Sequence, residues 1–140
     1  MRKGSPPVLH GGEPVAWGRG CVARGTFVFL SGSEGRDLET DVCASTIGEQ
    51  TEVTWNKIKV RLEEYGTSCE NIVQQMTFVT DMDEWVRQGM WYQTRWLRKN
   101  APRLLQDKPA GTLIGVNRLN LPEMKVEIQV IAVIPDGESS

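Results

Sequence analysis

Apolar residues recur along the chain with two different periods, which separate expected helices from expected strands. Between residues 47 and 65 they return every three or four positions, as on the buried face of a helix, and Gly66 supplies a stop. That face comprises Ile47, Thr51, Trp55, Ile58, Leu62 and Tyr65. A second helix is expected from a cap at Asp81 or Asp83 to about Lys99. Its apolar residues are Trp85, Val86, Met90, Tyr92 and Leu97.

Alternating and β-branched segments predict the strands. Val126, Ile128 and Val130 alternate with Lys125, Glu127 and Gln129, which indicates a long strand with one polar face over residues 125–133. Residues 72–80 and 109–116 also have the composition of strands. Residues 20–32 favour two short strands that turn at Arg24-Gly25 and pair as a hairpin. The polar residues 33–45 and residues 101–107 are expected to be connections.

The order strand, strand, helix, strand, helix, strand, strand favours an α+β fold, a mixed sheet with two helices packed on one face. Phe27–Leu30 and Val126–Val133 place apolar residues on both faces of that sheet. We therefore expect a second copy of the chain to cover the free face, with sites at subunit boundaries. Residues 1–13 are predicted to be an extended lead, 14–135 a single domain and 136–140 a flexible tail.

Composition and charge narrow the class of function. The 140 residues carry 16 basic and 18 acidic side chains, a formal net charge of −2 that gives little support to nucleic-acid binding. We expect no membrane span and no secretory signal, hence a cytoplasmic protein. The widely spaced Cys21, Cys43 and Cys69 and the single His10 fit neither a disulfide framework nor a metal site nor a nucleophilic relay. No cofactor or metal is expected, and the cysteines receive no role.

A series of short segments, each weak alone, is specific in its order and spacing. They are GTFVFLSG (25–32), EQT (49–51), IK with LEEYG (58–66), NIV (71–73), TFVTDMDEW (77–85), Tyr92, PAGT (109–112) and KVEIQVIAV (125–133). Together they resemble the reactive intermediate deaminase family, also called the YjgF family. The resemblance implies a chorismate-mutase-like fold and a homotrimer with a central barrel and three clefts between subunits. It also implies cofactor-free hydrolysis of imines and enamines such as 2-aminoacrylate to keto acids and ammonia.

The resemblance also assigns site residues. The family's catalytic carboxylate corresponds to Glu127, which would place a water and move a proton. The family grips the substrate carboxylate with an arginine in a Pro-Ala-Arg motif, whereas this chain reads Pro109-Ala110-Gly111-Thr112. Leu113, Gly89 and Gly18 also depart from the family pattern.

These departures predict a remodelled pocket, opened at Gly89 and Gly111 and walled by Trp17 and Trp85. The expected substrate is larger or less charged than 2-aminoacrylate, such as an aminomuconate from aromatic catabolism. Ser31 is expected to make a structural or backbone contact, and Thr112 either donates its hydroxyl or satisfies a strand edge. The residues that can replace the lost cation, with none favoured, are Arg19, Arg24, Lys108 and Arg118.

Two other functions stay open from the sequence. A non-catalytic trimeric protein that binds a small molecule or regulates is the main alternative, favoured by Gly111. A ribonuclease-type activity ranks third, because the net charge of −2 and the single histidine fit poorly with RNA cleavage by a general acid and base.

Overall fold

The longest helix, α1 (Ile47–Glu64), begins where its sequence provides a cap. In the computed structural model, which describes residues 1–137, the Thr46 hydroxyl accepts from the Glu49 backbone N–H at 3.1 Å and donates to the Glu49 carboxylate at 3.0 Å. Gly66, at φ 87°, follows the helix end. The predicted apolar face is buried except for Tyr65, which is 64% exposed because it caps the helix instead of continuing it.

The second helical region follows the predicted limits but contains a widened turn. Asp81 accepts from the Glu84 backbone N–H at 3.0 Å and so is the cap. The region continues through α2 (Met82–Glu84), the π-helical turn η2 (Trp85–Gly89) and α3 (Met90–Asn100), and the short helix η3 (Pro102–Leu105) follows. Trp55 of α1 stacks on Trp96 of α3 with ring centroids 5.4 Å apart, which joins the two long helices.

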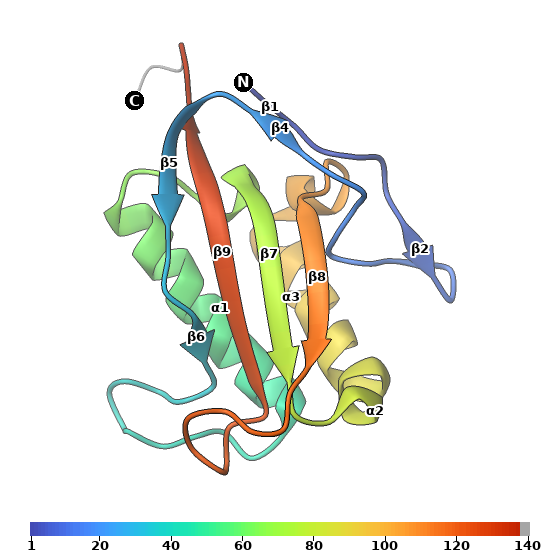
Figure 1. Ribbon diagram of the computed structural model, residues 1–140, viewed down its shortest axis with the longest axis vertical. Helices are drawn as coiled ribbons and strands as arrows, with labels where there is room; N and C mark the ends of the chain where they lie inside the picture. The colour runs from blue at the N-terminus through green and yellow to red at the C-terminus, as the bar shows by residue number, and fades with distance from the viewer. Residues whose placement is uncertain (138–140) are drawn as a thin grey trace.

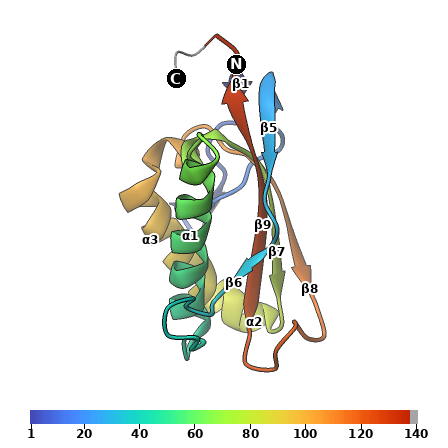
Figure 2. The ribbon, with the colours of Figure 1, turned by 90° about the vertical axis from the view of Figure 1, so that its left-hand side faces the viewer.

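The sheet is mixed, as predicted. Its strands lie in the order β5 (Gly25–Phe29), β9 (Val126–Pro135), β7 (Ile72–Val79) and β8 (Ala110–Gly115), and β6 (Ser33–Glu34) also pairs with β9. Strands β7 and β8 are parallel and the other pairs are antiparallel. Both long helices cover one face of the sheet and leave the other face open (Figures 1 and 2). This arrangement confirms the predicted fold class.

The N-terminal region corrects the predicted hairpin. Strand β4 (Val22–Ala23) pairs with β1 (Arg2–Lys3) and not with β5, so the expected pairing across Arg24-Gly25 is wrong. Gly25 redirects the chain at φ 146°, with Ile134 so close that a Cβ would overlap its carbonyl oxygen. Strands β2 (Leu9–His10) and β3 (Glu13–Pro14) form a separate pair, and we call the whole stretch of residues 1–18 the lead from here on. The last three residues of the predicted tail, 138–140, lie outside the described residues.

Other departures are local. The predicted loop over residues 33–45 contains β6, and the short helix η1 (Cys69–Asn71) precedes β7. Val126, Ile128 and Val130 face the helices and are buried, which confirms the predicted alternation in β9. No helix among residues 1–137 is long and apolar enough to cross a membrane.

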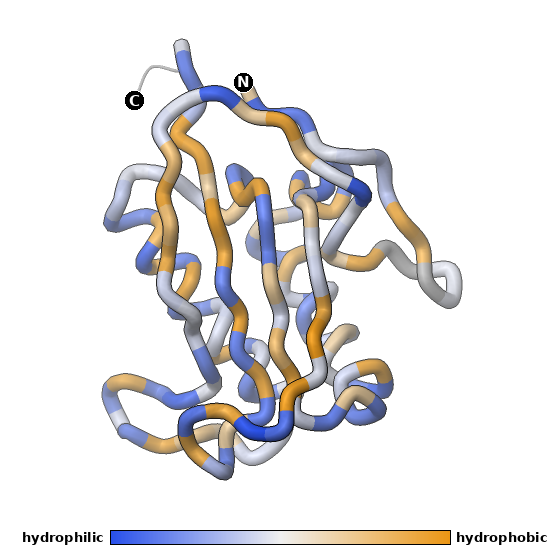
Figure 3. Tube along the Cα trace, viewed as in Figure 1, coloured by the Kyte–Doolittle hydropathy of each residue, from blue (hydrophilic) through white to orange (hydrophobic). Residues whose placement is uncertain are grey.

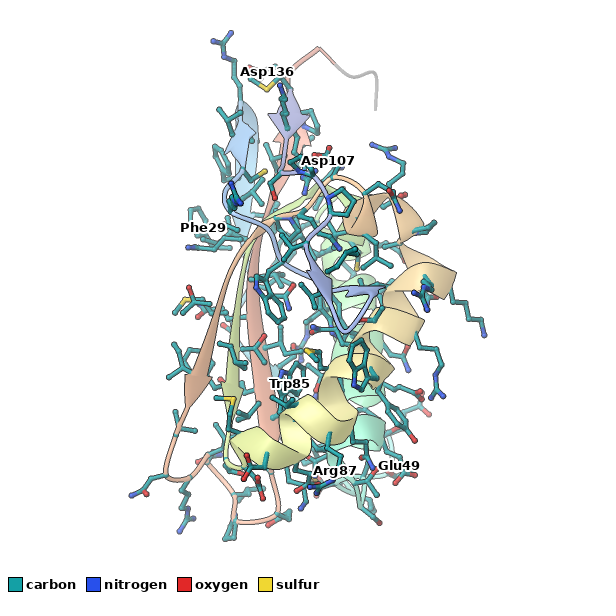
Figure 4. The ribbon with its side chains drawn as sticks, turned by 90° about the vertical axis from the view of Figure 1, so that its right-hand side faces the viewer. Phe29, Glu49, Trp85, Arg87, Asp107 and Asp136 are labelled. Atoms are coloured by element: carbon teal, nitrogen blue, oxygen red, sulfur yellow. The ribbon has the colours of Figure 1, made fainter. Side chains whose placement is uncertain are left out.

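The open face of the sheet is largely apolar. By register, Phe29 pairs with Ile131 and Phe78 pairs with Ile114, which places these four side chains on one face. Phe29 is 72% exposed, and Figure 4 shows it pointing away from the helices. Figure 3 shows apolar segments along β5, β7, β8 and β9. This apolar surface, which we call the open face, surrounds the polar residues of β9.

Candidate active site around Glu127

Glu127 lies on the open face, near the start of β9. Register places it between Phe78 of β7 on one side and Glu34 of β6 on the other. Gly32 lies against its carboxylate so closely that a Cβ at this position would overlap Glu127 Oε2. The segment Ser31-Gly32, which joins β5 to β6, therefore passes directly against the Glu127 carboxylate.

The electrostatic surroundings of Glu127 come mainly from Glu34 and Lys57. Burial raises the pKa of the Glu127 carboxyl, and the neighbouring Glu34 raises it further, whereas Lys57 lowers it. Lys57 Nζ donates to Glu34 Oε1 at 2.6 Å and to the Arg36 carbonyl at 2.8 Å. The side chains of Lys57 and Glu34 are only 11% and 19% exposed. Glu127 is thus a half-buried carboxylate next to an ion pair.

Sequence reasoning missed both Glu34 and Lys57. The predicted loop over residues 33–45 concealed β6, so the position of Glu34 opposite Glu127 had no sequence counterpart. The available signal was the glycine in Leu30-Ser31-Gly32, which interrupts a strand pattern that then resumes. Ser31 is exposed and lines a hollow of about 420 Å³ with Phe29, Gly32, Arg61 and Tyr65 among its walls.

The motif Pro109-Ala110-Gly111-Thr112 lies at the β8 edge of the sheet, whereas Glu127 lies toward the other edge, next to β6. Thr112 pairs with Met76, which pairs with Gln129, so two inter-strand spacings across β7 and two residues along β9 separate Thr112 from Glu127, roughly 12 Å. Pro109 is buried and Thr112 is exposed. A single chain therefore does not bring the motif into contact with Glu127.

The lead covers this motif with Trp17. Gly18 donates its backbone N–H to the Pro109 carbonyl at 2.8 Å, which places the lead beside the start of β8. A Cβ on Gly111 would overlap the Cβ of Trp17, and the Trp17 Cγ would lie at 3.2 Å. The space expected at Gly111 is therefore occupied, and the sequence prediction of an opening there is wrong.

The expected opening at Gly89 is also filled. Trp85 is fully buried, and its ring lies where a Cβ on Gly89 would have to be. Figure 4 shows Trp85 in the layer between the sheet and the helices. These two residues come from the π-helical turn and contact each other within the core, not at an open wall.

None of the four expected cations is placed next to Glu127 by a contact of the described chain. Arg19 and Arg24 are exposed, and Arg118 donates to the carbonyls of its neighbours Leu119 and Asn120. Lys108 is fully buried, its Nζ donates to the Val15 carbonyl, and burial lowers its pKa to about 8.

The described residues offer neither a metal cluster nor an activated thiol. Across residues 1–137, no three His, Cys, Asp or Glu side chains gather closely enough to hold a metal ion. Burial raises the pKa of the Cys69 thiol to about 12, and burial also raises the pKa values of Cys21 and Cys43. A raised pKa lowers the fraction of reactive thiolate, so these three cysteines are poor nucleophiles.

Comparison with known proteins identifies the fold and the family. The chain is 30% identical over 107 residues to a RutC family protein of Aquifex aeolicus, covering 76% of this chain and 80% of that protein. It is 28% identical over 112 residues to the 2-iminobutanoate/2-iminopropanoate deaminase of Salmonella typhimurium, covering 80% and 83%. The crystal structure of the YjgF gene product of E. coli superposes with a TM-score of 0.70 at 22% identity, covering 92% and 93%, which shows the same fold.

A sequence profile of the family described as Endoribonuclease L-PSP matches residues 14–134, nearly the whole described chain. The chain therefore belongs to the endoribonuclease L-PSP family, the YjgF family that its sequence resembles.

Proposed function

We propose that this protein hydrolyses an imine or enamine to a carbonyl compound and ammonia without a cofactor, and that Glu127 is its catalytic carboxylate. The observation that carries the proposal is the position of Glu127, which lies on the open face with its pKa raised by burial and by Glu34. A carboxylate with a raised pKa is a better base toward water at neutral pH. The activity named for the Salmonella relative belongs to the same chemical class.

One carboxylate suffices for this chemistry. Glu127 takes a proton from water as the water oxygen bonds to the imine carbon, and the C=N electron pair moves to nitrogen. Glu127 then passes that proton to nitrogen, which gives a carbinolamine. In the second half, the hydroxyl proton travels through Glu127 to the amino group. Ammonia leaves as the C=O bond forms, and the carboxylate is regenerated.

The proposed substrate is larger or less charged than 2-aminoacrylate. Gly111 offers no side chain to grip a substrate carboxylate, and the neighbouring Trp17 is a partly buried apolar ring. An extended intermediate of aromatic catabolism, such as an aminomuconate, is one compound of suitable size. We assign direct contact with substrate to Ser31, Thr112 and Trp17, and support of the pocket to Pro109 and Ala110. Trp85 and Gly89 would support the pocket indirectly, because they pack against each other in the core.

The complete site would need more than one copy of the chain. Within one chain the PAGT motif lies roughly 12 Å from Glu127, farther than a small imine can reach. In a homotrimer whose sheets meet face to face, Glu127 of one copy can lie across a cleft from Thr112 of the next. We propose that each active site forms at such a boundary.

Ammonia release tests the proposal. The wild-type protein is given 2-iminopropionate, 2-iminobutanoate, an aminomuconate and diphenylmethanimine, a neutral imine with two rings. We expect release from at least one of them and a loss of about 100-fold or more in Glu127→Gln, because the amide cannot accept a proton. Glu39→Gln, an exposed loop glutamate, is the matched control and should keep full activity. Equal rates in Glu127→Gln and wild type would overturn the assignment.

A binding or regulatory protein is the second candidate, and the occupied space at Gly111 favours it. Ligand binding without ammonia release across the whole panel would support that function in place of hydrolysis. A ribonuclease activity, which the family description names, ranks third. The ribonuclease function would rank higher if a highly purified sample degraded RNA and a single substitution abolished that degradation.

A further inference from the structure

Two carboxylates face each other across adjacent strands at the proposed site. Glu34 of β6 and Glu127 of β9 are direct cross-strand partners, a position in which like charges destabilise a sheet. Both residues are half-buried, so water screens their repulsion poorly. An arrangement that costs stability calls for a compensating charge, which identifies the role of Lys57.

Lys57 bonds directly to one of the two carboxylates, Glu34, and acts on Glu127 only through its charge. Its Nζ lies 2.6 Å from Glu34 Oε1 and 2.8 Å from the Arg36 carbonyl, and both contacts fix it on the Glu34 side. Strand β6 lies between α1 and β9 at the edge of the sheet, which is how a helix side chain reaches Glu34 (Figure 2). Glu34 is therefore the carboxylate that is paired directly with a cation, whereas Glu127 is half-buried beside that ion pair and has its pKa raised by burial and by Glu34.

The other charged groups at this edge have partners elsewhere. Arg61 donates to the Ser33 hydroxyl at 2.6 Å, and Lys125 lies 3.4 Å from the Glu84 carboxylate. On the side of β7, Glu127 faces the apolar Phe78. Lys57 is thus the cation that acts on Glu34 and Glu127, and its single positive charge balances one of their two negative charges.

We propose that Glu34, held by Lys57, is the positioning and specificity-determining residue of this site, and that it selects imines carrying no carboxylate beside the reacting carbon. The proposal rests on the proposed hydrolysis at Glu127 and narrows its substrate class, because it disfavours 2-aminomuconate, which carries a carboxylate on the reacting carbon. With Glu127 ionised, the three groups together carry one negative charge. A 2-imino acid would bring another negative charge into that cluster, whereas a neutral imine would not and a protonated imine would be attracted.

In the same arrangement, Glu34 and Glu127 have different roles in proton transfer. Glu34 does not touch the reacting atoms. It acts through Glu127, whose proton affinity it increases, so that Glu127 can take up the water proton and return it. Replacing Glu34 should consequently change both the pH at which Glu127 titrates and the preference for substrate charge, two readouts that a purely structural residue would not move together.

A carboxyl ¹³C NMR titration of Glu127 tests the positioning role without any substrate. The Glu127 signal is assigned with Glu127→Gln. We expect Glu34→Gln to lower the pKa of Glu127, because it removes the neighbouring negative charge, and Lys57→Met to raise it, because it removes the compensating cation. The control is Glu52→Gln, which breaks the exposed ion pair with Arg95 and should leave Glu127 unchanged. An unchanged Glu127 titration in both Glu34→Gln and Lys57→Met would overturn the positioning role.

Substrate preference tests the specificity role. The ratio of kcat/KM for diphenylmethanimine to that for 2-iminobutanoate should fall by tenfold or more in Glu34→Gln, and circular dichroism confirms that the variant is folded. An unchanged ratio would overturn the specificity role even if Glu127 proves catalytic.

A binding measurement covers the case in which no compound is hydrolysed and the proposed function fails. We expect wild type to bind benzamidinium, a stable planar cation resembling a protonated imine, in preference to 2-oxobutanoate. Glu34→Gln should reduce that preference at least tenfold, and an equal preference in both proteins would overturn the specificity role.

Discussion

At the scale of single residues, Gly111 shows how a distant segment decides which side chain a position accepts. The lead lies alongside the start of β8, where Gly18 bridges to Ala110, and the Cβ of Trp17 occupies the space that a Cβ on Gly111 would need. A larger residue at position 111 therefore cannot be added without moving the lead. Placing an arginine there would require Trp17 to change as well, so the side chains at positions 17 and 111 depend on each other.

We predict that Gly111→Ala lowers the free energy of unfolding by about 1–3 kcal/mol, the usual cost of overpacking. In a Trp17→Gly background, which removes the obstructing Cβ, the same substitution should cost much less. Urea denaturation of the four proteins in the cycle measures the coupling. Gly20→Ala serves as the control, because a Cβ there meets nothing within 4 Å. An equal cost of Gly111→Ala in both backgrounds would show that Trp17 is not the obstacle.

At the scale of elements, several bonds hold the lead against the start of β7 and against the segment between η3 and β8. Arg2 donates to the Ile72 carbonyl at 2.8 Å and pairs with Asp107 at 3.0 Å, and Ser5 and Lys108 exchange two backbone hydrogen bonds of 3.1 and 3.0 Å. Figure 4 shows Asp107 beside the start of the chain. The lead thus forms part of the domain's edge and positions Trp17 beside the start of β8.

The most unusual of these attachments is the Lys108 ammonium, which is fully buried and bonded to the Val15 carbonyl. Its pKa is lowered to about 8, so between about pH 8 and the ordinary lysine value of about 10.4 the unfolded chain binds more protons than the folded one. Stability should accordingly rise with pH across that window, because the folded protein no longer has to bury a charge.

We predict that Lys108→Met is more stable than wild type at pH 7, by on the order of 1 kcal/mol, and that its advantage shrinks as the pH approaches 10. Thermal unfolding followed by circular dichroism from pH 7 to 10 checks the trend. Lys99→Met, at an exposed lysine of α3, should run parallel to wild type. A wild-type curve that falls relative to Lys108→Met over this range would contradict the prediction.

Elements differ in how far their own sequence determines them. Helix α1 was predictable because its cap at Thr46, its apolar period and its stop at Gly66 are all local. The hairpin at Arg24-Gly25 was predicted wrongly because the true partner of β4 is β1, and nothing in residues 20–32 encodes that choice. Local patterns thus give element type more reliably than strand pairing.

The candidate site follows the same rule. Glu127 could be predicted from its strand pattern and from the family resemblance. Its neighbours Glu34 and Lys57 could not, because they reach it through the pairing of β6 with β9 and through α1. The overlap of Trp17 with Gly111 likewise depends on where the lead lies alongside β8. Contacts between segments far apart in the chain could not be predicted from the sequence alone.

At the scale of the whole molecule, the two layers leave one face of the sheet without cover (Figure 2). Phe27 and Phe29 are 42% and 72% exposed there, and Met76, Phe78, Ile114 and Ile131 share that face by register. An apolar surface built from four strands is the kind that proteins bury against a partner. Glu127 lies within it, so assembly and the proposed catalysis would use the same surface.

We therefore predict that the protein is a trimer in solution, with a mass three times the 15.7 kDa of one chain, and that Phe29→Asp dissociates it. Burying an aspartate between apolar sheet faces would leave a charge without water, whereas the separated subunit keeps it hydrated. Light scattering coupled to size-exclusion chromatography measures the mass. Val60→Asp, at a residue of α1 that is 54% exposed on the helical layer, is the control and should remain trimeric. A trimer that survives Phe29→Asp would place the interface elsewhere, and the active site would then have to form without Thr112 of a neighbouring copy facing Glu127.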